Sequence, residues 1–161
     1  MDFRRLQWVF PIAVTLHNAE EAIWMHGWAA NHLEDVVGRP PGATEIRAAL
    51  VVLTVAAFVA TYLSVRRGPE SIWAYLTFGY IIAMLANVFV PHVPAAIVVR
   101  GYAPGVVTAV LLNLPLMSYV ALRAVRDRWV SGWKAAVFAV VVPLTLAGMT
   151  SVFLILGRVI V

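Results

Sequence analysis

The chain has 161 residues, of which 62% are hydrophobic and 12% are charged, and its mean hydropathy is +0.86. Soluble domains are about 45–50% apolar and about 25% charged, so this composition excludes an ordinary soluble domain and predicts a membrane protein. The absence of cysteine excludes disulfides, thiolate metal sites and cysteine nucleophiles. The net charge of +4 does not indicate a nucleic-acid partner, because the positive residues lie at the ends of apolar runs.

Apolar runs of about 20 residues are long enough to cross a bilayer as helices. Five such runs follow one another along the chain, at 6–28, 46–65, 71–90, 103–122 and 134–157. Connections that contain proline, glycine or several charges separate them. The first run is too long and too polar in its middle for a cleaved signal peptide. The sequence therefore predicts an all-α, polytopic membrane protein, with residues 1–161 forming a single transmembrane domain of five helices.

The arginines and the lysine favour one orientation of these helices. With the N-terminus in the cytoplasm, the inner connections hold Arg4, Arg5, Arg66, Arg67, Arg123, Arg126, Arg128 and Lys134, and the outer connections hold Arg39, Arg47, Arg100 and Arg158. Cytoplasmic loops carry an excess of arginine and lysine. The eight-to-four distribution therefore predicts a multi-pass protein of the cell membrane with its N-terminus inside and its C-terminus outside.

The middle of the first run is polar. His17 and Glu21 are four residues apart and share one face of a helix, and Glu20 and Asn18 lie on the flanks of that face. Trp24 extends the same stripe by about one turn. An acidic residue at the centre of a transmembrane helix costs about 2.5–3.5 kcal/mol, so these side chains should face the protein interior. A bound metal ion, a proton on a glutamate or a charged His17 would each relieve that cost.

Later runs place further polar side chains at a similar depth. Asn87 lies in the upper third of the third run, His92 follows at its outer end, and Asn113 lies near the centre of the fourth run. We expect these residues to support the site on the first helix. The prolines and glycines between 91 and 105 fit either a re-entrant segment that returns His92 above the polar layer or a plain outer loop.

The pentapeptide His17-Asn18-Ala19-Glu20-Glu21 resembles the signature of the HXXEE family, a set of small integral membrane proteins. The similarity continues with "NVFVPH" at 87–92 and with "GYAPGVVTAVLLNLP" at 101–115. The resemblance implies that His17, Glu20 and Glu21 form the site. The family has no settled activity, so the resemblance implies no particular reaction.

One functional hypothesis is a membrane-embedded enzyme that acts on a lipophilic small molecule. In its metal-dependent form, His17, Glu20 and Glu21 bind a divalent ion, with His92 as a more distant further ligand. Imidazole and carboxylate suit Zn²⁺ and Fe²⁺, and either ion could activate water or polarise a carbonyl group. The spacing differs from the H-E-x-x-H pattern of zinc proteases, which counts against this form.

In the metal-free form, a protonated glutamate paired with His17 donates and removes protons. This chemistry suits an isomerase or cyclase acting on an alkene, with Trp24, Trp28 and Tyr80 screening a carbocation. The alternatives are a proton- or metal-coupled transporter and an accessory protein that binds a lipid or a metal. A dimer would supply the repeat that a transporter of this size lacks. The polar residues could also hold helices together without further function.

Overall fold

The computed structural model describes residues 2–33 and 40–160, with side chains as far as Met149. Arg39, which the orientation argument placed outside, is not among them. Within the described residues the chain is helical and contains no strand, which confirms the predicted all-α class. The elements, in chain order, are α1 (Phe3–Leu6), α2 (Val9–His32), α4 (Ala43–Arg67), α5 (Ile72–Asn87), the π-helix η1 (Val88–His92), α6 (Val93–Val98), α7 (Val106–Thr108), the π-helix η2 (Ala109–Asn113), α8 (Leu114–Arg126) and α9 (Gly132–Ile160).

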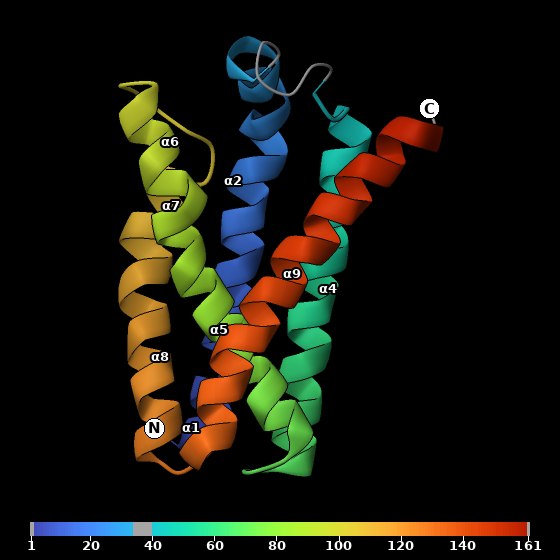
Figure 1. Ribbon diagram of the computed structural model, residues 1–161. Coiled ribbons are helices and arrows are strands. Elements are labelled where there is room, and N and C mark those ends of the chain that lie inside the picture. The colour runs from blue at the N-terminus through green and yellow to red at the C-terminus, as the bar shows by residue number, and fades with distance from the viewer. Residues whose placement is uncertain (1, 34–39, 161) are drawn as a thin grey trace.

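These elements form an elongated up-and-down bundle, with the N-terminus at the end where α4 meets α5 and α8 meets α9 (Figure 1). Polar side chains define several of the helix starts. The Ser71 hydroxyl accepts a hydrogen bond from the Ala74 N–H at the start of α5, and the Glu45 carboxylate accepts one from the Gly42 N–H at the start of α4. Both contacts satisfy donors that a helix N-terminus leaves free.

Four helical stretches are long and apolar enough to cross a membrane, judged by length and composition. They are Ala43–Arg67, Ile72–Val98, Val106–Arg126 and Gly132–Met149. They correspond to the second to fifth predicted runs, although the third continues to Val98 instead of ending near residue 90. The first predicted run corresponds to α2, which begins at Val9 and continues four residues beyond 28 to His32. This helix carries the polar HNAEE stretch and is not one of the four.

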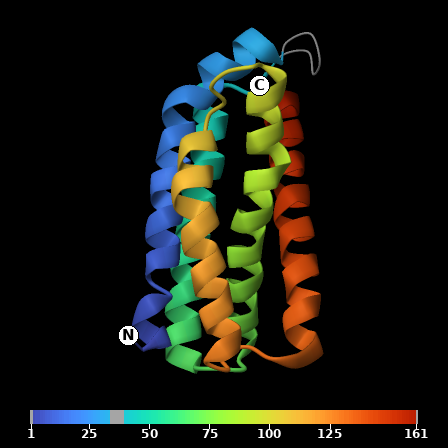
Figure 2. The same cartoon turned by 90° about the vertical axis from the view of Figure 1, so that its left-hand side faces the viewer.

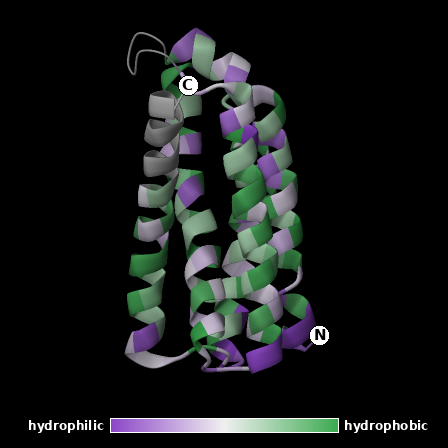
Figure 3. Cartoon of the chain, turned by 90° about the vertical axis from the view of Figure 1, so that its right-hand side faces the viewer, coloured by the Kyte–Doolittle hydropathy of each residue, from purple (hydrophilic) through white to green (hydrophobic). Residues whose placement is uncertain are grey.

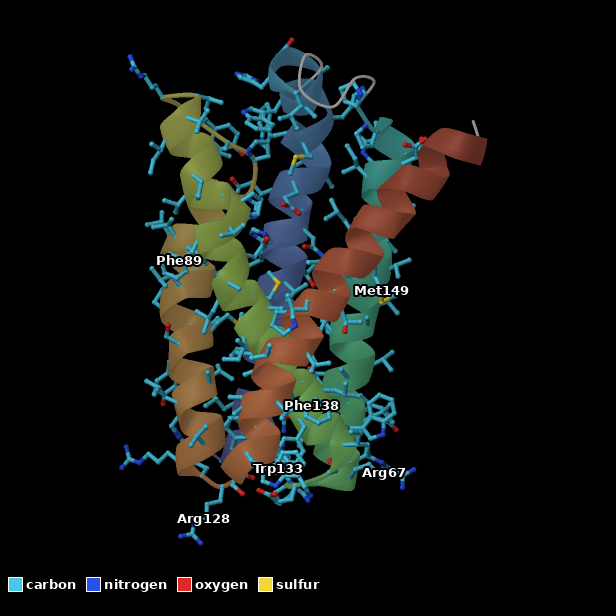
Figure 4. All side chains as sticks on the ribbon, in the orientation of Figure 1. Arg67, Phe89, Arg128, Trp133, Phe138 and Met149 are labelled. Carbon is cyan, nitrogen blue, oxygen red and sulfur yellow. The ribbon has the colours of Figure 1, made fainter. Side chains whose placement is uncertain are left out.

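Along the described helices, hydrophobic residues predominate in the middle of the bundle, and hydrophilic residues gather toward its ends (Figure 3). Phe89 and Met149 are 57% and 61% exposed and lie on its flanks, whereas Arg67 and Arg128 extend from the end that holds the N-terminus (Figure 4). Large apolar side chains facing outward at mid-height are typical of a surface that contacts lipid.

The interior contains an apolar core and a close helix contact. Phe10, Ile81 and Met117, from α2, α5 and α8, are fully or almost fully buried together. Gly79 brings α5 against α9, because a Cβ atom there would lie 2.5 Å from the carbonyl oxygen of Phe138. Small residues allow membrane helices to approach in this way.

A neutral polar cluster joins three parts of the chain near the N-terminal end. The Ser64 hydroxyl on α4 donates to the side-chain oxygen of Gln7 at 2.8 Å, and the Trp129 indole N–H donates to the same hydroxyl at 3.0 Å. All three side chains are buried. We call Gln7, Ser64 and Trp129 the inner cluster.

Irregular helical geometry occurs where α5 and α8 pass the polar part of α2. Val90 leaves the helical conformation within η1, next to Pro91, which has no N–H to donate. η2 packs against α2, α5 and η1. It belongs to the continuous stretch Val106–Arg126 (α7, η2 and α8), which we call the α7–α8 limb and which lies beside α2 (Figure 2). Such π-helical turns are frequent at functional sites.

The chain between 91 and 105 combines features of both expected alternatives. It remains helical through Val98, and the 99–105 connection then turns back down toward α7 (Figure 1). Gly105, at the end of this connection, has φ +83°, and a Cβ atom there would lie 2.4 Å from His92 Cε1 and 3.0 Å from His17 Cε1. The returning backbone therefore covers two imidazole rings at a distance that only glycine permits.

Candidate functional site

The HNAEE stretch lies near the middle of α2 and directs His17 and Glu21 toward the interior. His17 is 1% exposed and Glu21 is 12% exposed. As expected for residues four apart on a helix, the two side chains meet, with His17 Nε2 3.9 Å from Glu21 Oε1. A buried histidine and a largely buried carboxylate therefore share one face of this helix.

His92 completes this face from the other side of the bundle. The kink at Val90 and the π-helical turn η1 carry its ring to within 4.8 Å of the His17 ring, centroid to centroid, in an edge-to-face arrangement. His92 Nε2 lies 3.4 Å from Glu21 Oε1. His17, Glu21 and His92 each offer a ligand atom, and these atoms lie within 4.8 Å of one another. We call these three residues the outer cluster.

Asn87 lies between the two imidazoles. Its side-chain nitrogen is 3.2 Å from His17 Nε2 and 2.9 Å from His92 Nε2. The third helix thus brings an amide to the HNAEE face, as the sequence predicted. No other side-chain donor reaches these two Nε2 atoms, and none hydrogen-bonds to Glu21, among the residues that the structure describes.

The other ring nitrogens face the start of the α7–α8 limb. His17 Nδ1 lies 2.8 Å from the Thr108 hydroxyl. His92 Nδ1 faces Gly105, where an added Cβ atom would lie 2.9 Å from that nitrogen. The Nδ1 side of each imidazole therefore lies against residues 105–108, while its Nε2 faces Glu21.

Glu20 has a different environment from its neighbour. Its Oε2 accepts hydrogen bonds from the Thr108 N–H at 2.9 Å and the Thr108 hydroxyl at 2.6 Å, and its Oε1 accepts one from the Tyr102 hydroxyl at 2.8 Å. Successive residues on a helix point about 100° apart, so Glu20 and Glu21 do not face the same group. The sequence placed Glu20 in the metal set beside His17 and Glu21. The structure instead groups His92 with those two residues.

Two residues expected to support the site contact other parts of the protein. The Asn18 amide donates to the Leu50 carbonyl oxygen at 3.1 Å and to the Thr54 hydroxyl at 2.8 Å, so it ties α2 to α4. Trp24 is exposed and meets Tyr102 edge to face, with ring centroids 6.4 Å apart. Neither side chain contacts the outer cluster directly in the described structure.

Asn113 is fully buried on η2, and neither its amide nitrogen nor its amide oxygen has a hydrogen-bond partner among the described residues. It therefore does not bond to His17 or to the glutamates, contrary to the expectation that it would approach them as a partner.

The aromatic residues considered for a carbocation site are engaged elsewhere. The Tyr80 hydroxyl donates to the Leu53 carbonyl oxygen at 2.9 Å, and the Trp28 indole N–H donates to the Tyr102 carbonyl oxygen at 3.1 Å. The Trp28 ring also stacks on His32, with centroids 4.9 Å apart.

Sequence reasoning did not identify Tyr102, Gly105 or Thr108 as individual contributors. The signal available for them was "GYAPG" directly before an apolar run, since a turn of this composition beside a buried polar layer can bring backbone groups into that layer. The partner of each residue depends on how far the 99–105 connection returns into the bundle. No spacing along the chain encodes that distance.

A helical bundle with four membrane-length apolar helices, and a His–Glu–His cluster held between α2 and η1, defines the class of protein. The sequence profile described as "Protein of unknown function with HXXEE motif" matches residues 8–120. The chain belongs to this family, and the motif is His17-Asn18-Ala19-Glu20-Glu21. The match ends before α9 and includes all the site residues described above.

One relative is the uncharacterized protein YrkK of Bacillus subtilis (strain 168), which is 33% identical over 111 residues, or 69% of each chain. No solved structure matches the chain. These similarities establish the family and assign no reaction to it.

Proposed function

We propose that this protein is a metal-dependent enzyme of the cell membrane, and that its outer cluster binds Zn²⁺ or Fe²⁺ and acts on a lipophilic small molecule. The observation that carries the proposal is the convergence of His17, His92 and Glu21, whose ligand atoms lie within 4.8 Å of one another. The Nε2 atoms of His17 and His92 lie 3.9 and 3.4 Å from Glu21 Oε1. Two imidazoles and one carboxylate are the ligands of catalytic zinc sites and of non-haem iron sites.

The distances support an ion of this size. In a tetrahedral site with metal–ligand distances of about 2.1 Å, the ligand atoms lie about 3.4 Å apart. His92 Nε2 and Glu21 Oε1 are 3.4 Å apart, and His17 Nε2 is 3.9 Å from the same oxygen. Small side-chain movements would therefore close the set around one ion. A divalent ion would also neutralise Glu21, whose charge is costly at this depth.

The number of ligands supports catalysis more than a structural role. Structural zinc sites are usually closed by four protein ligands, whereas catalytic sites use three and leave a position for water or substrate. The outer cluster supplies three. At the open position an ion could activate water or polarise a carbonyl group, and a site inside the bilayer favours a lipophilic substrate.

The proposal includes α2 as a fifth membrane-crossing helix, with the N-terminus inside. Its 24 residues are long enough to cross a bilayer. His17 and Glu21 face the bundle, so the polar stripe need not face lipid. The excess of positive residues at the N-terminal end of the bundle supports the orientation.

Proton transfer without a metal is a second candidate at the same residues. Asn87 already presents its amide nitrogen to both Nε2 atoms, and a proton on Glu21 could be shared with His92 across 3.4 Å. This arrangement would perform general acid–base chemistry. Metal analysis separates the two candidates.

The experiment compares the chain's four histidines. Protein purified in detergent is incubated with Zn²⁺ or, without oxygen, with Fe²⁺, then desalted and measured by elemental mass spectrometry. We expect one ion per wild-type chain and almost none in His17→Gln or His92→Gln. His26→Gln and His32→Gln are the matched controls, because among the described residues His26 bonds to the Pro41 carbonyl oxygen and His32 to the Trp28 carbonyl oxygen and ring, all outside the outer cluster.

Turnover is tested by comparing the extractable lipids of cells that produce wild-type protein or the His92→Gln variant. We expect at least one lipophilic species to differ between them. A wild-type protein that takes up neither metal, or equal losses in the His26→Gln and His92→Gln variants, would overturn the metal-dependent proposal.

A further inference from the structure

Glu20 and Glu21 are adjacent in sequence, but only Glu21 faces the imidazole Nε2 atoms. Glu20 directs both of its oxygens toward the start of the α7–α8 limb. The Thr108 N–H that it binds belongs to the first turn of that limb, where backbone donors have no partner within the helix. A carboxylate at this position is stabilised by charge-assisted hydrogen bonds.

Thr108 lies between Glu20 and His17. Its hydroxyl oxygen is 2.6 Å from Glu20 Oε2 and 2.8 Å from His17 Nδ1. A hydroxyl group has one proton to donate, and a carboxylate can only accept. The Gly105 carbonyl oxygen, 3.2 Å from the same hydroxyl oxygen, can likewise only accept. The Thr108 proton therefore points to Glu20, the nearer acceptor, and the hydroxyl oxygen accepts the proton carried by His17 Nδ1. A neutral His17 then carries no proton on Nε2, the atom that faces Glu21, so the lone pair there can accept from the Asn87 amide or bind an ion.

We propose that Glu20 and Thr108 are positioning residues that hold His17 with its proton on Nδ1, so that Nε2 is free to bind an ion. The proposal about the tautomer stands on these contacts alone, and its consequence for ion binding rests on the proposed function. Hydrogen bonds behind a metal-ligating histidine commonly fix its tautomer and orientation in this way. The two glutamates thus have separate roles. Glu21 is a ligand of the ion, and Glu20 accepts the hydroxyl proton of Thr108.

The segment 105–108 lies against the second imidazole as well. His92 Nε2 faces Asn87 and Glu21, and its Nδ1 faces Gly105, where an added Cβ atom would lie 2.9 Å from that nitrogen. Both rings therefore present Nε2 to Glu21, and one short stretch of chain, "GVVT", lies against both of them.

The test uses a matched pair of variants at Thr108. Thr108→Val keeps the shape of the side chain and removes the hydroxyl, whereas Thr108→Ser keeps the hydroxyl. Nitrogen-15 NMR of labelled histidine in metal-free protein reports which ring nitrogen of His17 carries the proton. We expect an Nδ1 proton in wild type and in Thr108→Ser, and an Nε2 proton or a mixture in Thr108→Val. A merely structural role for Thr108 would not change this signature.

The second measurement is the affinity for Zn²⁺, determined by competition with a fluorescent chelator. We expect Thr108→Val to bind Zn²⁺ about 10–100-fold more weakly than wild type, which is the usual loss when a residue that hydrogen-bonds to a metal ligand is removed. We expect Thr108→Ser to bind Zn²⁺ as wild type does. Should Thr108→Val fail to fold, Glu20→Gln tests the same contact. A glutamine oxygen cannot serve both Thr108 and Tyr102, so we expect a mixed His17 tautomer and weaker binding.

The outcomes separate this inference from the proposed function. A wild-type His17 with its proton on Nε2 would overturn the inference, as would a folded Thr108→Val protein with unchanged tautomer and affinity. A wild-type protein that binds no Zn²⁺ or Fe²⁺, but whose Nδ1 proton is lost in Thr108→Val, would support the positioning role and overturn the metal-dependent function.

Discussion

The inner and outer clusters are both buried polar groups in one bundle, but they differ in how donors and acceptors are matched. In the inner cluster, the Trp129 N–H meets the Ser64 oxygen, and the Ser64 hydroxyl meets the Gln7 oxygen. All of its groups are neutral, and the Gln7 amide nitrogen is the one atom of the cluster that lacks a partner among the described residues. In the outer cluster, two Nε2 atoms face a carboxylate oxygen, and among the described residues only Asn87 directs a side-chain donor toward the two Nε2 atoms.

This difference distinguishes a structural contact from a site. Neutral polar groups with matched donors and acceptors hold membrane helices together at little cost. Acceptors that converge, one of them a carboxylate, repel one another unless a cation or a proton lies between them. The outer cluster therefore needs a cation or a proton, which the neutral groups of the inner cluster do not need. Substitutions in the two clusters should have opposite consequences for ion binding and for stability.

Glu21→Gln should give the largest change in ion binding. The amide keeps the shape of the side chain but removes a charged ligand. We therefore expect the affinity for Zn²⁺ to fall by more than about 100-fold, a larger loss than that for residues that only hydrogen-bond to a ligand. Thermal stability of the metal-free protein should be retained or raised, because a buried carboxylate charge disappears. Chelator competition and thermal unfolding in detergent provide the two measurements.

The control for this change is Glu70→Gln. Glu70 lies in the connection between α4 and α5 and accepts a hydrogen bond from the Tyr75 hydroxyl, far along the chain from the outer cluster. We expect it to leave the affinity for Zn²⁺ unchanged. A Glu21→Gln protein that binds Zn²⁺ as tightly as the Glu70→Gln protein would remove Glu21 from the ligand set.

Gly105→Ala should disturb both imidazoles together. Its Cβ atom would lie 2.4 Å from His92 Cε1 and 3.0 Å from His17 Cε1, and its φ of +83° adds strain of about 1–2 kcal/mol. The rings must move, so we expect lower stability and loss of ion binding. Elemental analysis and thermal unfolding measure these effects.

Gly132→Ala separates the clash from the backbone strain. Gly132 also has a positive φ, +61°, but a Cβ atom there meets nothing within 4 Å. This variant should lose stability through strain alone and keep its ion. If both alanine variants retained the ion equally, the close approach of Gly105 to the imidazoles would not matter for binding.

The parts of the structure that depend on local pattern could be predicted from the sequence. Run length and breakers gave the helices after α2 to within a few residues at most ends, and a four-residue spacing placed His17 beside Glu21. The position of Asn87 also followed from depth along its run. Each of these inferences uses distances along one helix, which the sequence determines.

The assignment of His92 in place of Glu20 depended on tertiary geometry. The non-helical Val90 and the π-helical turn redirect His92 into the bundle, and the 99–105 connection supplies Thr108 and Tyr102 as partners for Glu20. Proline and glycine indicate that the chain bends, but they do not state by how much. A bend of a few residues decides which of two adjacent glutamates faces the histidines.

Ser64→Ala should reduce stability without affecting the ion. It leaves the Gln7 oxygen and the Trp129 N–H buried without a partner, which costs about 1–3 kcal/mol. Thr61→Val is the control, because in the part of the chain that the structure describes the Thr61 hydroxyl bonds to the Ala57 carbonyl of its own helix and to no other residue. Thermal unfolding should show a clear loss for Ser64→Ala and a smaller one for Thr61→Val. A loss of ion in either variant would contradict the separation of the two clusters.

Asn113→Leu should give the smallest change and, for stability, the opposite sign. Asn113 is fully buried, and both polar atoms of its amide lack a partner among the described residues. A buried polar group without a partner costs about 1–3 kcal/mol, so a leucine of similar size should leave the unfolding temperature unchanged or raise it. The ion content should remain that of wild type, because Asn113 has no hydrogen bond to the outer cluster among the described residues.

The control is Met117→Ala, which creates a cavity at a fully buried apolar position on the following helix, α8. Its fall in unfolding temperature measures, in the same assay, the loss of stability caused by damage to the core. A loss for Asn113→Leu as large as that for Met117→Ala would mean that the amide is paired in the working protein, by water or by a bound molecule beside the outer cluster.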